Sequence, residues 1–173
     1  MIARNDADAM VRRAYERFGE QFGTMSPAQF AYRPAAQSWS VADVAEHVAL
    51  SNAGILQRLS AGLRTPLSGP LGVEDEEIPY LFYAGEEPTH IAAPTGTWTD
   101  VAVAADAYAA SARAVTSWAE ETNVDLRLYG GRHPMFGLLD GVQWLLFAAA
   151  HTERHRRQIL GYSVRPDFPG LDV

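Results

Sequence analysis

Apolar residues recur at helical spacing along four long stretches of the sequence, and this pattern constrains the fold more than any other feature. In the first stretch, five apolar residues occupy one helix face at i, i+3, i+4, i+7 and i+11: Val11, Ala14, Tyr15, Phe18 and Phe22. No stretch of comparable length alternates polar and apolar residues with the two-residue period of a strand. A chain of 173 residues has the size of one domain. We therefore predict a single all-α domain over residues 1–173, folded as a four-helix bundle.

Residues that cap helices set the predicted boundaries. The first helix is predicted over residues 6–22. The other three follow residues whose side chains can accept hydrogen bonds from the first turn of a helix, which are Ser40, Thr99 and Asp140. The helix after Ser40 is predicted to extend to about residue 63, and the helix after Asp140 to about residue 161.

The predicted second and third helices are joined by a long crossover, residues 65–98. It contains five prolines and six acidic residues, which are Glu74, Asp75, Glu76, Glu77, Glu86 and Glu87. Loops of this length in compact domains are usually functional or disordered. A crossover this long allows the two helices that it joins to run parallel. We expect residues 73–88 to be mobile and to border a site, while the role of the whole crossover stays open.

The composition excludes several kinds of site and partner. The sequence has no cysteine, which excludes disulfides, cysteine-ligated zinc, iron–sulfur clusters and a cysteine nucleophile. The net charge of −7 argues against nucleic acid as a partner. The sequence shows neither a secretory signal nor an apolar run near the roughly 18 residues of a membrane span. We therefore expect a cytoplasmic protein without a membrane partner. The oligomeric state stays open, with a homodimer as one option.

Three of the five histidines fall within the predicted core-facing stripes. His47 lies in the stripe of the second helix, and His151 and His155 lie one turn apart in the stripe of the fourth. A buried imidazole must satisfy both ring nitrogens, because each unsatisfied group costs roughly 1–3 kcal/mol. A divalent metal would satisfy three convergent imidazoles at once. In the alternative interpretation, the histidines only fill the bundle core and form separate hydrogen bonds.

Four polar residues near the histidines each have two interpretations. Asp43 either caps its helix or orients His47, and Ser51 either donates to an oxygen at the metal or bonds back to its own helix. Arg154 either binds an anionic substrate or stays in solvent. Gln158 either contacts the site or fills a polar gap. The sequence leaves these alternatives open and assigns no general base.

The remaining histidines and the familiar catalytic motifs indicate no second site. His133 belongs to the turn before the fourth helix and is expected to shape that turn. His90 is expected to be a loop residue of the crossover. No Gly-x-Ser-x-Gly nucleophile elbow, phosphate-binding loop or dinucleotide fingerprint occurs in the sequence.

Three segments carry a resemblance to a known family. They are YRPAAQSWSVADVAEHVALS at residues 32–51, APTGTW at residues 93–98 and HPMFGLLDGVQWLLFAAAHTERHRRQI at residues 133–159. In this order the segments resemble the DinB/YfiT-like superfamily. The resemblance implies a four-helix bundle with a long crossover between the second and third helices. It also implies a divalent metal on three histidines, which map onto His47, His151 and His155. The acidic residues 72–88 do not align with the family pattern, so the substrate stays undefined.

The resemblance also implies two kinds of reaction. Several members of the superfamily are thiol transferases that use bacillithiol or mycothiol, and others are regarded as metal-dependent hydrolases. Three histidine ligands leave at least one position open on a metal, where water or a thiol could be activated. Zinc, nickel, iron and manganese all accept this ligand set. We expect a transferase that uses a low-molecular-weight thiol on a small molecule, with a hydrolase or a non-catalytic metal- or ligand-binding protein as the alternatives.

Overall fold

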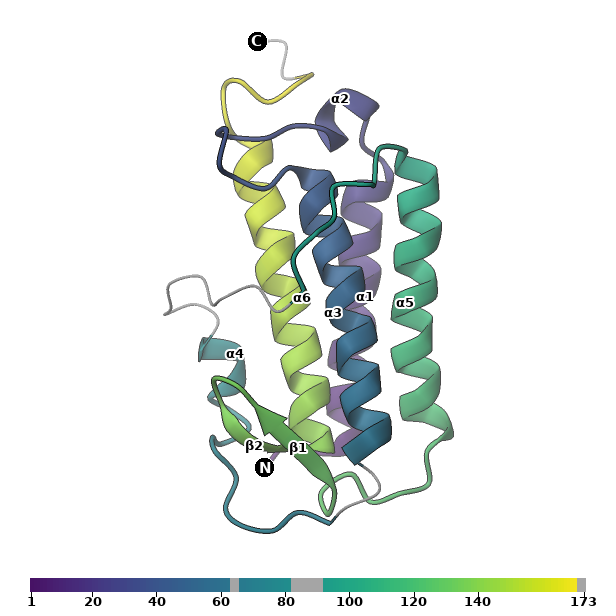
Figure 1. The fold of residues 1–173 in the computed structure, drawn as a ribbon, viewed down its shortest axis with the longest axis vertical. Helices are drawn as coiled ribbons and strands as arrows, with labels where there is room; N and C mark the ends of the chain where they lie inside the picture. Colours follow the sequence, from purple (N-terminus) through teal and green to yellow (C-terminus); the bar gives the residue numbers. More distant parts are fainter. Residues whose placement is uncertain (63–65, 82–91, 171–173) are drawn as a thin grey trace.

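The computed structural model describes residues 1–62, 66–81 and 92–170. Four long helices lie side by side in it (Figure 1), which are α1 (Arg4–Gly23), α3 (Val41–Gly62), α5 (Val101–Glu121) and α6 (Gly141–Ser163). In this view α1 and α6 run upward, whereas α3 and α5 both run downward. The helices α3 and α5 are therefore parallel neighbours, an arrangement that the long crossover between them permits. The prediction of a mostly helical chain is confirmed. None of the helices in the described ranges is long and apolar enough to span a bilayer.

Reciprocal hydrogen bonds begin two of the long helices at the predicted residues. At the start of α3, Ser40 Oγ accepts from the backbone N–H of Asp43 at 3.1 Å, and Asp43 Oδ2 accepts from the N–H of Ser40 at 2.9 Å. Asp140 and Gln143 form the same arrangement at the start of α6. Both pairs satisfy backbone donors that an uncapped first turn would leave without a partner.

Two predicted helix starts were wrong by one or two residues. The N-cap of α5 is Asp100 rather than Thr99, because the Asp100 carboxylate accepts from the N–H of Val103 at 3.0 Å. Helix α1 begins at Arg4 rather than at residue 6, after an N-cap alanine without a side-chain hydrogen bond. A long-range contact holds this first turn instead, since Arg4 Nη2 donates to the carbonyl of Thr122 at 2.9 Å.

The hydrophobic core lies between the long helices. All five apolar residues of the first predicted stripe are buried, as the helical spacing predicted. Phe18 and Phe22 of α1 pack on Tyr108 of α5 with ring centroids 5.1 and 5.4 Å away. The Tyr108 hydroxyl donates to the carbonyl of Tyr15 at 3.0 Å, so its one polar atom is satisfied inside the core.

Short elements occupy the connections. Helix α2 (Pro27–Phe30) follows α1, and α4 (Ile78–Leu81) lies in the crossover beside α6 (Figure 1). The strands β1 (Gly130–His133) and β2 (Gly137–Asp140) form an antiparallel hairpin that leads directly into α6. The hairpin agrees with the expectation that strands are at most short. It fixes the position of the first turn of α6, because Asp140 is both the last residue of β2 and the N-cap of the helix.

The first part of the crossover is packed, which corrects the expectation that all of residues 73–88 are mobile. The Asp75 side chain is only 3% exposed and accepts from Arg127, which also donates to Asp140 at 2.8 Å. Ile78 is fully buried. These contacts hold Asp75 at the beginning of α6, about 16 Å along the helix from His151 at 1.5 Å per residue. Residues 82–88 of the expected mobile segment lie outside the described residues.

Candidate metal centre

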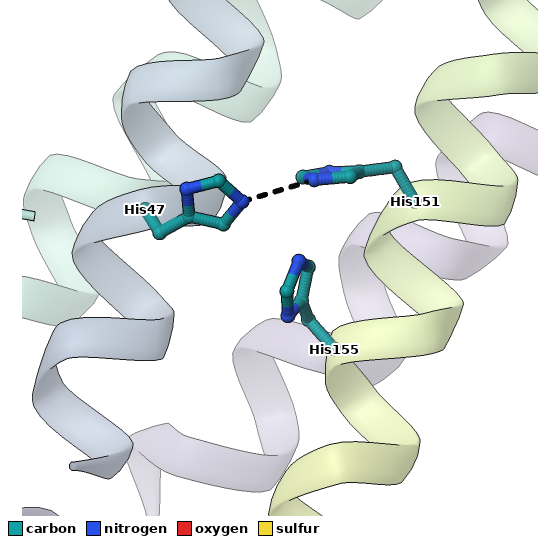
Figure 2. Close-up of side chains that lie close together, drawn as sticks. All are labelled: His47, His151 and His155. Carbon is teal, nitrogen blue, oxygen red and sulfur yellow. Dashed lines mark hydrogen bonds between the residues drawn. The ribbon is translucent and has the colours of Figure 1, made fainter. Parts of the chain in front are cut away.

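Three buried histidines from two helices converge at one point. His47 extends from the second turn of α3, and His151 and His155 extend toward it from successive turns of α6 (Figure 2). The Nε2 atoms of His47 and His151 lie 3.1 Å apart. One ring nitrogen from each histidine lies within 4.8 Å of the other two. The structure therefore brings together the three residues that the sequence selected as metal ligands.

The outer ring nitrogens of two of these histidines are held by oxygen acceptors. His47 Nδ1 lies 2.6 Å from the carbonyl oxygen of Ala92, and His155 Nδ1 lies 2.8 Å from Oε1 of Gln158. An oxygen that only accepts requires an N–H at each Nδ1. In a neutral imidazole the lone pair is then on Nε2. Both rings are consequently oriented with an unprotonated nitrogen available toward the centre of the cluster.

The electrostatic environment keeps His151 neutral. Burial lowers the pKa of His151 well below its ordinary value, and electrostatic interactions with His155, His47 and Arg154 act in the same direction. A neutral imidazole is the form that binds a metal, since a protonated ring has no lone pair to donate. The site therefore does not need to lose a proton from His151 before it can accept a cation near neutral pH.

Aromatic rings surround the histidines. The Trp39 ring centroid lies 4.7 Å from that of His47 and 6.3 Å from that of His155. On the other side Phe147, one turn before His151, stacks on that ring at 5.7 Å with an interplanar angle of 17°. These rings reduce the rotational freedom of the imidazoles and restrict water around them. Phe147 precedes His151 by four residues on one helix, and this spacing is the sequence signal for the contact.

The four polar candidates have different positions. Gln158 contacts His155 and also donates from Nε2 to the Tyr162 hydroxyl at 2.8 Å. Of its two interpretations, the geometry supports contact with the site rather than filling of a polar gap. Asp43 acts in the cap of α3 and pairs with Arg33 at 2.7 Å, as its capping interpretation predicts. Ser51 lies half-buried one turn after His47. Arg154 is half-buried, and its charge acts on His151.

His133 shapes a turn, as predicted. Its Nδ1 accepts from the backbone N–H groups of Met135 and Phe136 at 3.2 and 3.3 Å, and its ring stacks on Phe136 with an interplanar angle of 13°. The residue is buried at the end of β1 and does not belong to the three-histidine cluster. His90 lies outside the described residues.

Two groups at the site were missed by sequence reasoning. The Ala92 carbonyl is a backbone group, so no side chain marks it in the sequence. Glu46 is 3% exposed and accepts hydrogen bonds from the segment after Ala92. The sequence did contain a signal for Glu46. It is a carboxylate in an apolar part of the predicted helix, directly before the candidate ligand His47.

The chemistry of the three histidines fits a divalent cation. Neutral imidazoles suit zinc, nickel and iron, and three of them leave coordination positions for a further ligand. Oxygen acceptors at the opposite ring nitrogens are the usual support for histidine ligands, because they fix the tautomer and raise the basicity of Nε2. His47 and His155 both have such an acceptor. The arrangement can therefore hold a metal and present it to a small molecule.

Comparisons with known proteins agree with this arrangement. The sequence model of the DinB superfamily matches residues 10–159, which include the three histidines, all of α3 and α5, and all but the start of α1 and the end of α6. No curated protein and no solved structure shows significant similarity to the chain. The family match covers far more than half of the sequence. This chain therefore belongs to the DinB superfamily.

Proposed function

We propose that His47, His151 and His155 bind one divalent metal ion and that the protein uses it to transfer a low-molecular-weight thiol to a small molecule. The observation that carries the metal part is the convergence of three buried imidazoles from α3 and α6, with acceptors behind two of them. The thiol part is supported by the resemblance to superfamily members that use bacillithiol or mycothiol. A bound divalent metal would supply Lewis-acid activation of a thiol or of water.

The protein's own residues would bind the metal ion and orient the histidines and the small molecule around it. The three histidines would hold the ion, while the Ala92 carbonyl and Gln158 keep His47 and His155 in one tautomer. Trp39 provides an apolar surface against the imidazole rings of His47 and His155. Arg154 places a positive charge near His151 and would attract an anionic group on the small molecule. No covalent enzyme intermediate is needed, and without cysteine the chain has no thiol nucleophile of its own.

Elemental analysis of protein purified without an affinity tag tests the metal. We expect about one divalent ion per chain, and we expect His151→Ala to lose most of it. His133→Ala is the matched control, because His133 is also buried but lies outside the cluster. If His47→Ala and His151→Ala retain as much metal as the wild type, the proposed site is wrong.

Cobalt(II) substitution tests the reaction class. Because the chain has no cysteine, any thiolate-to-cobalt absorption must come from an added thiol. We expect the visible spectrum to change when bacillithiol or mycothiol is added. No change with any thiol, together with turnover of an ester or amide, would instead indicate a hydrolase. No change and no turnover on a broad panel would indicate a binding protein.

A further inference from the structure

Glu46 is a buried carboxylate that accepts three hydrogen bonds from one short segment of the described chain. It is 3% exposed and lies on α3 directly before His47. Its oxygens accept from the Thr95 hydroxyl, from the Gly96 N–H at 3.0 Å and from the Thr97 hydroxyl at 3.3 Å. A buried carboxylate is costly unless such donors satisfy it. The three donors therefore fasten residues 95–97 to α3.

The same segment supplies the acceptor for a proposed metal ligand. Ala92 precedes Thr95 by three residues, and its carbonyl oxygen lies 2.6 Å from His47 Nδ1. Two neighbouring residues of α3 thus hold the two ends of one short piece of chain. Glu46 binds residues 95–97, and His47 contacts the carbonyl of Ala92. Pro94 lies between these two contacts and restricts the backbone there. A displacement of residues 95–97 would therefore be passed on to the Ala92 carbonyl.

The position of that carbonyl decides which nitrogen of His47 faces the cluster. While Ala92 accepts from Nδ1, the proton stays there and the Nε2 lone pair is directed toward His151. If the carbonyl moves away, the ring loses the contact that selects this tautomer. The ring could then rotate or carry its proton on Nε2, and a ring protonated on Nε2 cannot bind a metal through that atom.

We propose that Glu46 is a positioning residue for the metal site: it anchors residues 95–97 and so holds the Ala92 carbonyl against His47 Nδ1. The expected effect of Glu46 on metal affinity rests on the function proposed above, whereas its effect on the His47 tautomer does not. Glu46 does not belong to the three-histidine group. Its influence reaches His47 only through the segment that it holds.

Two measurements on the full chain test the proposal. The first is the zinc affinity of Glu46→Ala, measured by competition with a chelator. We expect it to fall about 10-fold, the lower end of the loss typical for residues behind a ligand. The second is nitrogen-15 NMR of the histidine rings in the metal-free protein. We expect His47 to be protonated on Nδ1 in the wild type and to populate both tautomers in Glu46→Ala.

Control variants separate positioning from a general loss of folding. Glu16→Ala removes an exposed carboxylate from α1 and should change neither measurement. Glu46→Gln keeps an acceptor oxygen and should recover part of both effects. Thr95→Val together with Thr97→Val removes donors from the segment, and we expect this variant to match Glu46→Ala. A variant with lower thermal stability but wild-type zinc affinity and His47 tautomer would overturn the proposal.

The outcomes also separate this proposal from the proposed function. If the wild type binds none of zinc, nickel, iron and manganese but Glu46→Ala changes the His47 tautomer, the metal function fails and the positioning role stands. If the wild type binds zinc and Glu46→Ala changes neither affinity nor tautomer, the metal function stands and the positioning role fails.

Discussion

His155 and Gln158 are joined by a hydrogen bond of 2.8 Å between Nδ1 and Oε1, one turn apart on the same helix. The amide of Gln158 is itself held, because its Nε2 donates to the Tyr162 hydroxyl at 2.8 Å. A short relay along one face of α6 thus extends from Tyr162 to the cluster. Both of its hydrogen bonds lie within α6, and they orient the imidazole ring of His155.

We expect Gln158→Leu to weaken zinc binding by about 10-fold, since the residues that orient metal ligands typically contribute 10–100-fold in affinity. Leucine keeps the size of the side chain but cannot accept from His155 Nδ1. Tyr162→Phe should cause a smaller loss, because it removes only the hydroxyl that holds the amide. Chelator competition measures both variants. Unchanged affinity in Gln158→Leu would show that the hydrogen bond does not support the site.

Arg127→Ala should destabilise the fold by about 2–3 kcal/mol, because it leaves the carboxylates of Asp75 and Asp140 buried without their cation. Urea unfolding followed by circular dichroism measures the loss. Arg157→Ala is the control. It removes an arginine that is 54% exposed and pairs with Glu153, so it should cost no more than about 0.5 kcal/mol. Equal losses in the two variants would mean that the Arg127 cluster contributes no more than a surface pair.

The stability of the protein should depend on His133 between pH 6.5 and 4. Burial and the nearby Arg58 charge lower the pKa of His133 to about 4. The unfolded state therefore binds more protons than the folded state in this window, so the contribution of His133 to stability falls as the pH decreases through it. In His133→Asn this contribution disappears, while the amide oxygen can still accept from the turn.

The comparison of His133→Asn with the wild type requires unfolding free energies at several pH values. We expect the variant to lose about 1 kcal/mol at pH 7 from less complete packing and hydrogen bonding. We also expect a shallower decrease in stability from pH 6.5 to 4. Parallel curves for the two proteins would show that His133 binds protons equally in the folded and unfolded states.

Zinc should stabilise the wild type against unfolding. At a free concentration 100 times the Kd, a ligand that binds only the folded state contributes about 2.7 kcal/mol. His155→Ala should lose most of this increment, whereas His133→Asn should retain it. Thermal unfolding with and without zinc measures the difference. An equal increment in His155→Ala would place zinc at some other site.

Local patterns predicted the helices and the three histidines. Ser40 and Asp140 cap α3 and α6 because capping depends on residues only three positions apart. The histidines could be selected because helical spacing alone places them on buried faces. The predicted N-cap of α5 was wrong by one residue because Thr99 and Asp100 are adjacent and both suit an N-cap. In each case the evidence lay within one or two turns of chain.

Long-range pairings could not be predicted in the same way. The contact between Arg127 and Asp75 joins residues 52 positions apart, and nothing in the local sequence connects them. Residues 73–88 were expected to be mobile because they are rich in acidic residues and proline and show little helical pattern. For Asp75, the side chain of Arg127 and the backbone N–H of Ile2 supply the missing partners from elsewhere in the fold.

The separation of His47 from His151 has a kinetic consequence. They are 104 residues apart along the chain, so the cluster cannot exist until α3 and α6 have docked across a very large loop. Closing such a loop is a slow and late event in folding. An ion that binds only to the docked pair therefore cannot nucleate the fold. The ion should therefore change the unfolding rate of the folded protein. The metal-bound protein should fold no faster than the metal-free protein but should unfold more slowly.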